Sequence, residues 1–277
     1  MNCAPALEVL LAKGTPTPEA IGEFIDANGP FPLFDQTRAT FLFRGAADAV
    51  YWQHWIFGLP TSQEFLRVEG TDLWHLTVDL RKNSRIEYKL LVDYGDNRVL
   101  VRDPLNPLRA QDPYGANSVC ATEGYARPEW TMPSPDVRAG RMDTFGIYSD
   151  AFGGPKLIQV YRPNRFRKTR RYPLLVVHDG TDYQRFSAFK IVLDNLIHAM
   201  EIPPMIVAFS DSPDRMTEYT NDERHCKHIA EELVPAVEAR YPIDQRKASR
   251  CVMGASFGGV ASLATAWRYP SVFGKLL

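Results

Sequence analysis

A glycine-flanked serine in the C-terminal part of the chain has the spacing of a catalytic nucleophile. Residues 254–259 read Gly-Ala-Ser-Phe-Gly-Gly, between an apolar run at 251–253 and a helix-like stretch at 260–269. In a sharp strand-to-helix turn the serine hydroxyl stands clear of the sheet, and the strained backbone requires small neighbours two positions to either side. The pattern therefore predicts a nucleophile elbow with Ser256 at its apex, and with the Phe257 amide placed to face a developing oxyanion.

A second motif, His178-Asp179-Gly180-Thr181, follows the apolar run 174–177. A loop at the carboxyl end of a sheet strand is where α/β proteins bind ligands. An acyl-transfer site needs a second amide donor for the oxyanion, and Gly180 permits the close backbone approach that such a donor requires. We expect His178 to shape this loop rather than to act as the base.

Four charged residues after the apolar run 205–209 are expected on the same rim as the elbow. They are Asp211, Asp214, Arg215 and Glu218. Their types are compatible with two roles, which are binding the substrate and forming an internal ion-pair network that holds the rim in place. The sequence leaves both open, and the candidate substrate-loop residues are His178, Asp179, Arg215 and Glu218.

Two further histidines, His225 and His228, lie on a predicted helix over 223–241. Its apolar residues recur at every fourth position, at Ile229, Leu233 and Val237. A general base must come within hydrogen-bond reach of the serine oxygen. From their spacing we predict instead that both histidines lie on the solvated face of this helix.

Length and composition indicate an ordinary globular protein of about two domains. The 277 residues are 45% hydrophobic and 23% charged with a formal net charge of −1, so no global field favours a nucleic acid or a membrane surface. Neither a secretory signal nor an apolar run long enough to span a bilayer is visible, which predicts a cytoplasmic protein. Four scattered cysteines without a C-x-x-C pair argue against a zinc site and a disulfide framework. We expect no metal and no cofactor.

The densest charge run is Arg162–Arg171, in which six of ten residues are basic. It lies between two predicted strands of the α/β part. One interpretation is a solvated hairpin, and the other is a docking site for an anionic ligand such as a siderophore complex.

The pattern of hydrophobic residues divides the chain into four parts. Residues 1–35 are predicted to be helical, and 36–122 contain short alternating segments, which are typical of an antiparallel β-sandwich of immunoglobulin size. Residues 123–150 are proline-rich and indicate a linker. From 151 to 277, near-continuous apolar runs alternate with helical patterns, which predicts an α/β domain with a mainly parallel sheet.

Two parts of the chain resemble known families. The pieces Phe41–Arg44, Gly70–Trp74, Tyr88–Leu90 and Asp103-Pro104 are similar to the early-set, Ig-like domain found before the catalytic domain of enterochelin-esterase-like proteins and of glycogen-branching enzymes. Residues 155–277 resemble the esterase family that includes enterochelin esterase, feruloyl esterases, S-formylglutathione hydrolase and mycolyltransferases. The motifs that carry this second resemblance are Tyr172–Tyr183, Leu193–Ile197, Pro204–Val207, Arg215, Glu218-Tyr219, Asn221, Glu223-Arg224 and Glu232–Pro235.

The second resemblance implies an α/β-hydrolase fold and a serine esterase. By analogy, Ser256 is the nucleophile, and the amides of Phe257 and Thr181 hold the oxyanion. In α/β-hydrolases the acid and the histidine follow the serine in the chain, and no histidine follows Ser256 here. We therefore expect a chain that is truncated after the elbow helix, is inactive, and self-associates into a homo-oligomer through its uncovered sheet.

The function expected from these residues is hydrolysis of a small-molecule carboxylic ester through an acyl-enzyme, with a siderophore or carbohydrate ester as the substrate. One alternative is a non-catalytic module that binds a carbohydrate or a siderophore. Another is a carbohydrate acyl esterase that removes feruloyl or acetyl groups. Labelling by a fluorophosphonate distinguishes an activated serine from a buried or unactivated one.

Overall fold

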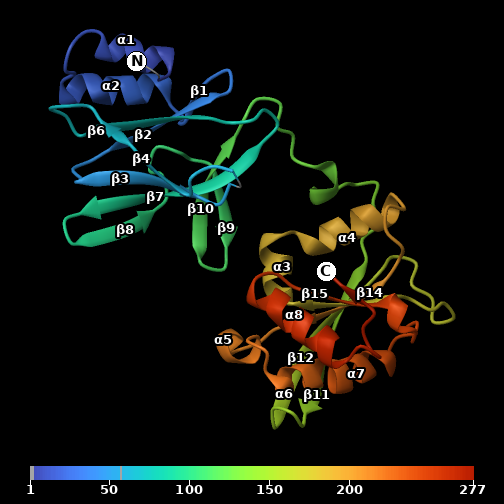
Figure 1. The fold of residues 1–277 in the computed structure, drawn as a ribbon. Helices are drawn as coiled ribbons and strands as arrows, with labels where there is room; N and C mark the ends of the chain where they lie inside the picture. Colours follow the sequence, from blue (N-terminus) through green and yellow to red (C-terminus); the bar gives the residue numbers. More distant parts are fainter. Residues whose placement is uncertain (1–2, 57) are drawn as a thin grey trace. The chain divides into compact units, whose positions relative to one another are not determined.

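The computed structural model describes residues 3–56 and 58–277, which form two compact units, Met1–Arg127 and Pro128–Leu277 (Figure 1). Each unit has hydrophobic clusters of its own. The boundary between the units falls inside the proline-rich stretch that the sequence indicates as a linker. Among the described residues, no helix combines the length and the apolar character needed to cross a bilayer.

The N-terminal unit begins with two short helices and continues as a series of strands. The helices are α1 (Pro5–Leu11) and α2 (Pro18–Asn28), and Thr17 caps α2 by accepting a hydrogen bond from the Ala20 amide. The strands are β1 (Leu33–Asp35), β2 (Arg38–Arg44), β3 (Ala49–His54), β4 (Ser62–Glu64), β5 (Leu66–Arg67), β6 (Leu73–Asp79), β7 (Arg85–Tyr94), β8 (Asn97–Val101), β9 (Arg109–Asp112) and β10 (Gly115–Ala121).

These strands form two antiparallel sheets. One has the order β1-β2-β6-β5, and the other has the order β4-β3-β7-β10-β9, with β8 paired to β7. Side chains of both sheets meet in one core around Phe41, Trp52 and Tyr88, whose rings contact one another. Leu42, on the opposite face of β2, packs with Leu7 of α1 in a second cluster. Successive side chains of a strand point to opposite faces of the sheet, so neighbouring residues of β2 pack into two different cores.

The C-terminal unit alternates strands and helices. Its strands are β11 (Arg141–Ser149), β12 (Gly154–Arg162), β13 (Leu174–His178), β14 (Ile206–Ser210), β15 (Arg250–Met253) and β16 (Lys275–Leu276). Its helices are α3 (Gly180–Phe186), α4 (Phe189–His198), α5 (Arg215–Glu218), α6 (Glu223–Lys227), α7 (Val234–Glu238) and α8 (Phe257–Arg268), with a π-helical turn η2 (His228–Leu233) and two 3-10 turns, η1 (Glu129–Thr131) and η3 (Lys247–Ser249).

One sheet of order β11-β12-β14-β13-β15-β16 forms the middle layer of this unit. The strands β14, β13, β15 and β16 are parallel, whereas β11 and β12 pair in the antiparallel sense. Leu175 and Val177 of β13 face the cluster with α4, and Leu174 and Val176 face the cluster with η2 and α7. Because β13 is buried on both faces, it is apolar until His178, its last residue.

The segment predicted as one helix over 223–241 consists of α6, η2 and α7 in direct succession. Pro235, in the first turn of α7, has no amide hydrogen, and its ring would collide with the carbonyl of the preceding turn in a regular α-helix. The π turn before it replaces the regular hydrogen-bond pattern with a wider one. The helix therefore continues past the proline instead of ending there.

Part of the predicted linker over 123–150 is a strand. Arg141–Ser149 form β11, which pairs along its whole length with β12. Phe145 and Ile147, two residues apart, pack against the core of the sheet. The alternation of buried and exposed side chains that marks a strand is therefore present, but it extends over only a few residues. The prolines that suggest a linker end at Pro135, and the strand begins only after them.

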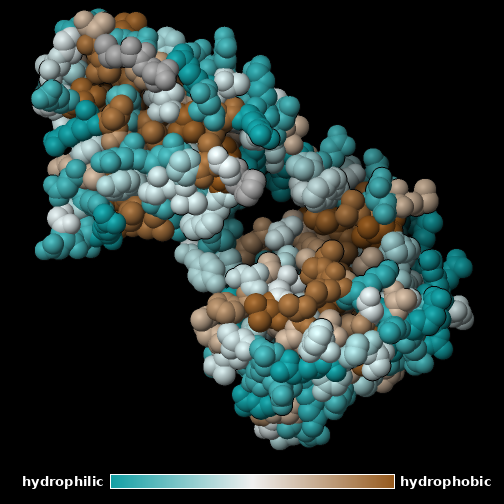
Figure 2. Space-filling view, in the orientation of Figure 1, coloured by the Kyte–Doolittle hydropathy of each residue, from teal (hydrophilic) through white to brown (hydrophobic). Residues whose placement is uncertain are grey.

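Helix α8 has an apolar face that is exposed. Val260, Leu263 and Trp267 are 44%, 56% and 81% exposed, and they follow one another at helical spacing. Figure 2 shows a band of hydrophobic residues across the face of the C-terminal unit on which α8 lies. Self-association, which we expect from the sequence, stays a prediction.

Candidate active site

The elbow predicted around Ser256 connects β15 to α8. Ser256 is exposed and has φ 54° and ψ −124°, a left-handed φ that residues with a Cβ rarely adopt. The turn depends on two glycines. A Cβ on Gly254 would overlap the Gly258 carbonyl, and a Cβ on Gly258 would lie 2.9 Å from an Asp179 carboxylate oxygen. The motif thus folds as its spacing predicts, as a strand, a sharp turn and a helix.

The two predicted oxyanion donors differ in what they contact. Phe257 is the first residue of α8, and its amide donates to no other described residue. The Thr181 amide donates to Asp211 Oδ1 at 2.9 Å, and the Thr181 hydroxyl donates to Asp211 Oδ2 at 2.6 Å. One predicted donor is therefore open, and the other already binds a carboxylate.

Asp179 and Arg215, two of the candidate substrate-loop residues, pair with each other. Arg215 Nε and Nη2 donate to the two Asp179 carboxylate oxygens at 2.7 and 2.8 Å. The central carbon of the Arg215 guanidinium also lies 5.9 Å from the ring centre of Phe257 and 5.7 Å from that of Tyr219. This bidentate pair joins the loop after β13 to α5 and to the first turn of α8. Of the two roles left open by the sequence, the contacts of Asp179 and Arg215 are those of an internal ion pair.

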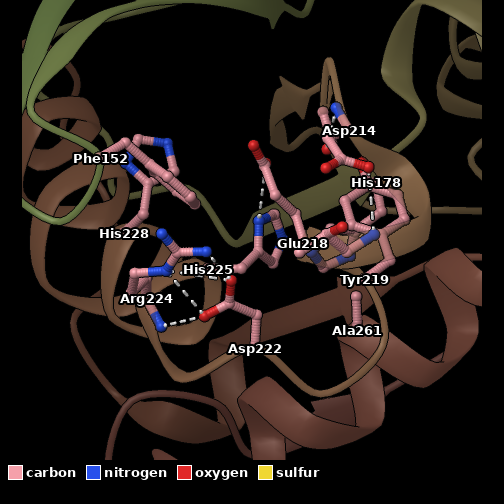
Figure 3. Close-up of polar contacts among 12 residues, drawn as sticks. Phe152, His178, Asp214, Glu218, Tyr219, Asp222, Arg224, His225, His228 and Ala261 are labelled. Atoms are coloured by element: carbon pink, nitrogen blue, oxygen red, sulfur yellow. Dashed lines mark hydrogen bonds and ion pairs between the residues drawn. The ribbon is translucent and has the colours of Figure 1, made fainter.

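His178 and His225 lie against each other inside the unit (Figure 3). Their Nε2 atoms are 2.9 Å apart, and only 0% and 1% of the two residues are exposed. The prediction of a solvated face for His225 and His228 is therefore wrong, because both are buried. His225 stands four residues before Ile229, so it extends the buried stripe of Ile229 and Leu233 by one turn. That spacing was visible in the sequence.

The hydrogen-bond partners assign the protons in this buried chain of contacts. Ser262 donates its only hydrogen to the Gly258 carbonyl at 2.8 Å, so it accepts from His178 Nδ1 at 2.9 Å. His178 Nε2 is then the acceptor for His225 Nε2–H. The other nitrogen of His225, Nδ1, faces Glu218 Oε2 at 3.7 Å, and neither atom has a hydrogen-bond partner among the described residues. Polar contacts thus connect α8, β13, α6 and α5.

Burial and neighbouring groups set the charges in this chain. Burial lowers the pKa of His178 to about 3, with a further contribution from His225, so His178 is neutral at pH 7. Burial alone would raise the pKa of Glu218, but its contacts with His225 and Ser212 and the Lys156 ammonium, 3.5 Å away, lower that pKa below its ordinary value. Glu218 is therefore a buried carboxylate with a cation beside it, and it does not face solvent.

The described residues bring no base into contact with Ser256. Both ring nitrogens of His178 contact buried residues, Ser262 and His225. His228 Nδ1 is 2.7 Å from Glu232 Oε2. Among the side chains that the structure places, no histidine and no carboxylate forms a hydrogen bond with Ser256. Residues 3–56 and 58–277 also contain no group of three or more His, Cys, Asp or Glu side chains arranged to hold a metal ion.

The chain is similar to known esterases. Residues 149–277 match the family model described as "Putative esterase". The iron(III) enterobactin esterase of Escherichia coli K12 is 26% identical over 247 residues, which cover 78% of this chain and 59% of that protein. The uncharacterized protein YjcH of Bacillus subtilis is 30% identical over 138 residues, which cover 47% of this chain and 58% of that one. The chain thus spans less than two thirds of the length of these relatives.

A solved structure shares the fold. The enterochelin esterase of Shigella flexneri aligns with a TM-score of 0.68 and 22% sequence identity, over 90% of this chain and 73% of that one. At this identity the likeness is one of fold. The C-terminal unit accordingly has a fold of the α/β-hydrolase type.

Proposed function

We propose that this protein is a serine esterase of the enterochelin-esterase-like type, which hydrolyses a carboxylic ester through an acyl-enzyme on Ser256. The observation that carries the proposal is the left-handed backbone of Ser256, which sets this exposed residue at the apex between β15 and α8. The serine oxygen attacks the ester carbonyl, the alcohol leaves with the proton, and water then releases the acid and restores the serine. The similarity to esterases supports this reaction class.

For the oxyanion we propose the amides of Phe257 and Thr181. The Phe257 amide is open at the N-terminus of α8, where the partial positive charge of the helix favours an anion. Thr181 has to exchange its hydrogen bonds to Asp211 for a bond to the substrate oxygen. Asp179 and Arg215 hold the start of α3, which carries Thr181, and so they position this donor rather than bind the substrate.

The substrate class that we propose is the ester of a siderophore. The proposal rests on the relatives that cover about three quarters of this chain, which are named iron(III) enterobactin esterases. The rivals are a carbohydrate acyl esterase and a non-catalytic binding module. For the N-terminal unit we propose an early-set, Ig-like domain, in keeping with its two packed antiparallel sheets.

We expect the 277-residue chain to hydrolyse p-nitrophenyl acetate only weakly, because no base contacts Ser256 among the described residues. Serine hydrolases without a complete triad retain only about 10³–10⁴-fold acceleration over water. Ser256→Ala should abolish the slow labelling by a fluorophosphonate and leave only the acceleration that the oxyanion hole and binding supply without the serine. Ser271→Ala, which alters an exposed serine after α8, should change neither. Steady-state hydrolysis and in-gel fluorescence measure the two effects.

Three outcomes would contradict parts of this proposal. Labelling that persists in Ser256→Ala would mean that another residue is the nucleophile. Fast hydrolysis that vanishes in Ser256→Ala would keep the nucleophile but contradict the low activity, and would mean that a base reaches it in solution. A wild-type chain that binds a siderophore but neither hydrolyses it nor takes up label would favour the binding module.

Asp211→Ala should speed the reaction of Ser256 with a fluorophosphonate by about tenfold. The Asp211 carboxylate has to leave the Thr181 amide before a phosphonyl oxygen can bind there, and one hydrogen bond of this kind corresponds to about 1–1.5 kcal/mol of the barrier. The same change should lower the free energy of unfolding by about 1 kcal/mol, because Asp211 also caps the second residue of α3. Labelling kinetics and thermal unfolding measure the two effects.

Asp214→Ala is the matched control. Asp214 caps α5 by accepting from the Thr217 amide, so its removal should cost similar stability without any gain in labelling rate. A slower reaction in Asp211→Ala would mean that the carboxylate organises the Thr181 loop and does not compete with the substrate.

A further inference from the structure

The basic run Arg162–Arg171 borders a pocket that ester hydrolysis does not use. The run forms a loop rather than the predicted hairpin, because β12 pairs with β11 and β14 but not with β13. In Figure 1 this loop is the olive segment that projects from the C-terminal unit on the side away from α5. The pocket has a volume of about 510 Å³. Arg138, Arg165, Arg170 and His198 are among the residues that line it, and Ile197 and Met200 supply apolar surface.

Three of the arginines around this pocket have no counter-ion among the residues that the structure describes. Arg162, at the start of the run, is held by an ion pair with Asp143. Arg138, Arg165 and Arg170, by contrast, form no ion pair with any residue that the structure describes. Like charges gathered around one hollow repel one another. A bound anion would relieve that repulsion and interact with all three at once.

The carboxylates of the pocket do not neutralise it. Asp194 is buried in its floor and is already bonded to Lys190 at 2.7 Å and to the Tyr161 hydroxyl at 2.8 Å. Asp136 lines the rim and offsets one positive charge. The three arginines therefore leave the pocket with a net positive charge.

The backbone holds Arg165 in a conformation that a residue with a Cβ rarely adopts. Its φ is 59°, and the Asn164 side chain accepts a hydrogen bond from the Arg165 amide at 2.9 Å. Such strained residues concentrate at sites where a side chain has to be aimed. Arg165 and Asn164 also line a second hollow of about 290 Å³, together with Arg141 and Arg162, so Arg165 lies on the ridge between two basic hollows.

The pocket lies at the edge of the sheet opposite the elbow. Tyr172 and Pro204 come just before the parallel strands β13 and β14, whereas Ser256 follows the carboxyl end of β15. The five residues of β13 separate the two edges by about 16 Å. A ligand bound here cannot contact Ser256, so the pocket is a second site rather than an extension of the first.

We propose that this pocket binds a small organic phosphate. A planar guanidinium donates two parallel hydrogen bonds to a phosphate, and three such groups can surround its oxygens. The volume is that of a site for a small molecule, and Ile197 and Met200 offer apolar contact to the organic part beside the phosphate. The site is independent of the ester hydrolysis proposed above.

Isothermal titration calorimetry of the full chain tests the site, with phenyl phosphate, inorganic phosphate and inorganic pyrophosphate as probes. The variant Arg165→Gln with Arg170→Gln should weaken the binding of phenyl phosphate at least about tenfold. The matched control is Arg167→Gln with Lys168→Gln, which removes two positive charges from the same loop but alters no residue of the pocket. The control should leave the dissociation constant within about twofold of wild type.

Each outcome decides the proposal. Phenyl phosphate should bind more tightly than inorganic phosphate, because only phenyl phosphate uses the apolar surface. Equal weakening in the two double variants would reduce the effect to the general charge of the loop and overturn the site. Absence of binding by the wild-type chain to all three probes would do the same. Tighter binding of pyrophosphate than of phenyl phosphate would contradict the proposal of an organic phosphate, because it would show that the pocket recognises only the anion. All four residues are exposed, so glutamine should be tolerated at each position, and unchanged thermal unfolding would confirm this.

Discussion

Gly254→Ala should destabilise the C-terminal unit by about 3 kcal/mol or more and lower its melting temperature by about 6–12 °C. The added Cβ would overlap the backbone carbonyl of Gly258. Neither neighbour can retreat, because β15 is paired with strands on both sides and the start of α8 is tied through Ser262 to His178. Differential scanning calorimetry of the full chain measures the shift.

Gly146→Ala is the control for this substitution. A Cβ on Gly146, in β11, would meet no atom within 4 Å, so the same change there should stay within about 0.5 kcal/mol of wild type. Gly254→Ala should also lose the fluorophosphonate labelling of Ser256, because the turn that exposes the serine cannot form. A Gly254→Ala chain that melts with the wild type and takes up label would refute the close contact.

The C-terminal unit should lose stability as the pH falls from about 6.5 towards 3, and His178 should be a main cause. Burial lowers the folded-state pKa of His178 to about 3, whereas the unfolded chain takes up the proton near the ordinary value of about 6.5. Between these values the unfolded state binds more protons, so stability is fully present above pH 6.5 and is lost on acidification. The pKa difference corresponds to at most about 4–5 kcal/mol.

His178→Gln should flatten this pH dependence. Glutamine can still bond to Ser262 and His225 but takes up no proton, so the variant should be less stable than wild type at pH 7 and lose less on going to pH 4. His198→Gln, at an exposed position on α4, is the control for replacing a histidine by glutamine. Hydrogen–deuterium exchange of peptides from 128–277 localises the effect. Parallel pH profiles for wild type and His178→Gln would show that carboxylates such as Glu218 and Glu232 account for the acid lability, and not His178.

The elbow and several of the strands could be predicted from the sequence because their signals are local. Gly254 is required by its contact with Gly258 of the same motif, although the space at Gly258 is limited by Asp179, from the loop after β13. The buried strands β13 and β14 are nearly continuous apolar runs. Strand β6 covers the residues over which apolar and polar residues alternate in the sequence. In each case the chain's own period or a short motif is enough to place the element.

The contacts between distant segments were not predictable in the same way. The Asp211 carboxylate meets Thr181 only because β13 and β14 are neighbours in the sheet, so the loops that follow them lie side by side. Spacing alone leaves open whether a charged rim residue faces a ligand or a protein group. His225 is the exception, since its place on the apolar stripe was visible, but a histidine on a helix is more often taken for a solvated residue.

The π turn between α6 and α7 has a consequence for how this helix can change through evolution. In a regular α-helix, two residues four positions apart point in directions that differ by about 40° around the helix axis. Between His225 and Val237 these differences would add up to about a third of a turn. The π-helical segment η2 has more residues per turn than an α-helix, so it removes part of this angular difference. Both side chains therefore stay on the buried face of the helix. A relative that lost one residue here would rotate its counterpart of His225 away from β13. Helix length and the identity of that residue should therefore vary together among homologous chains.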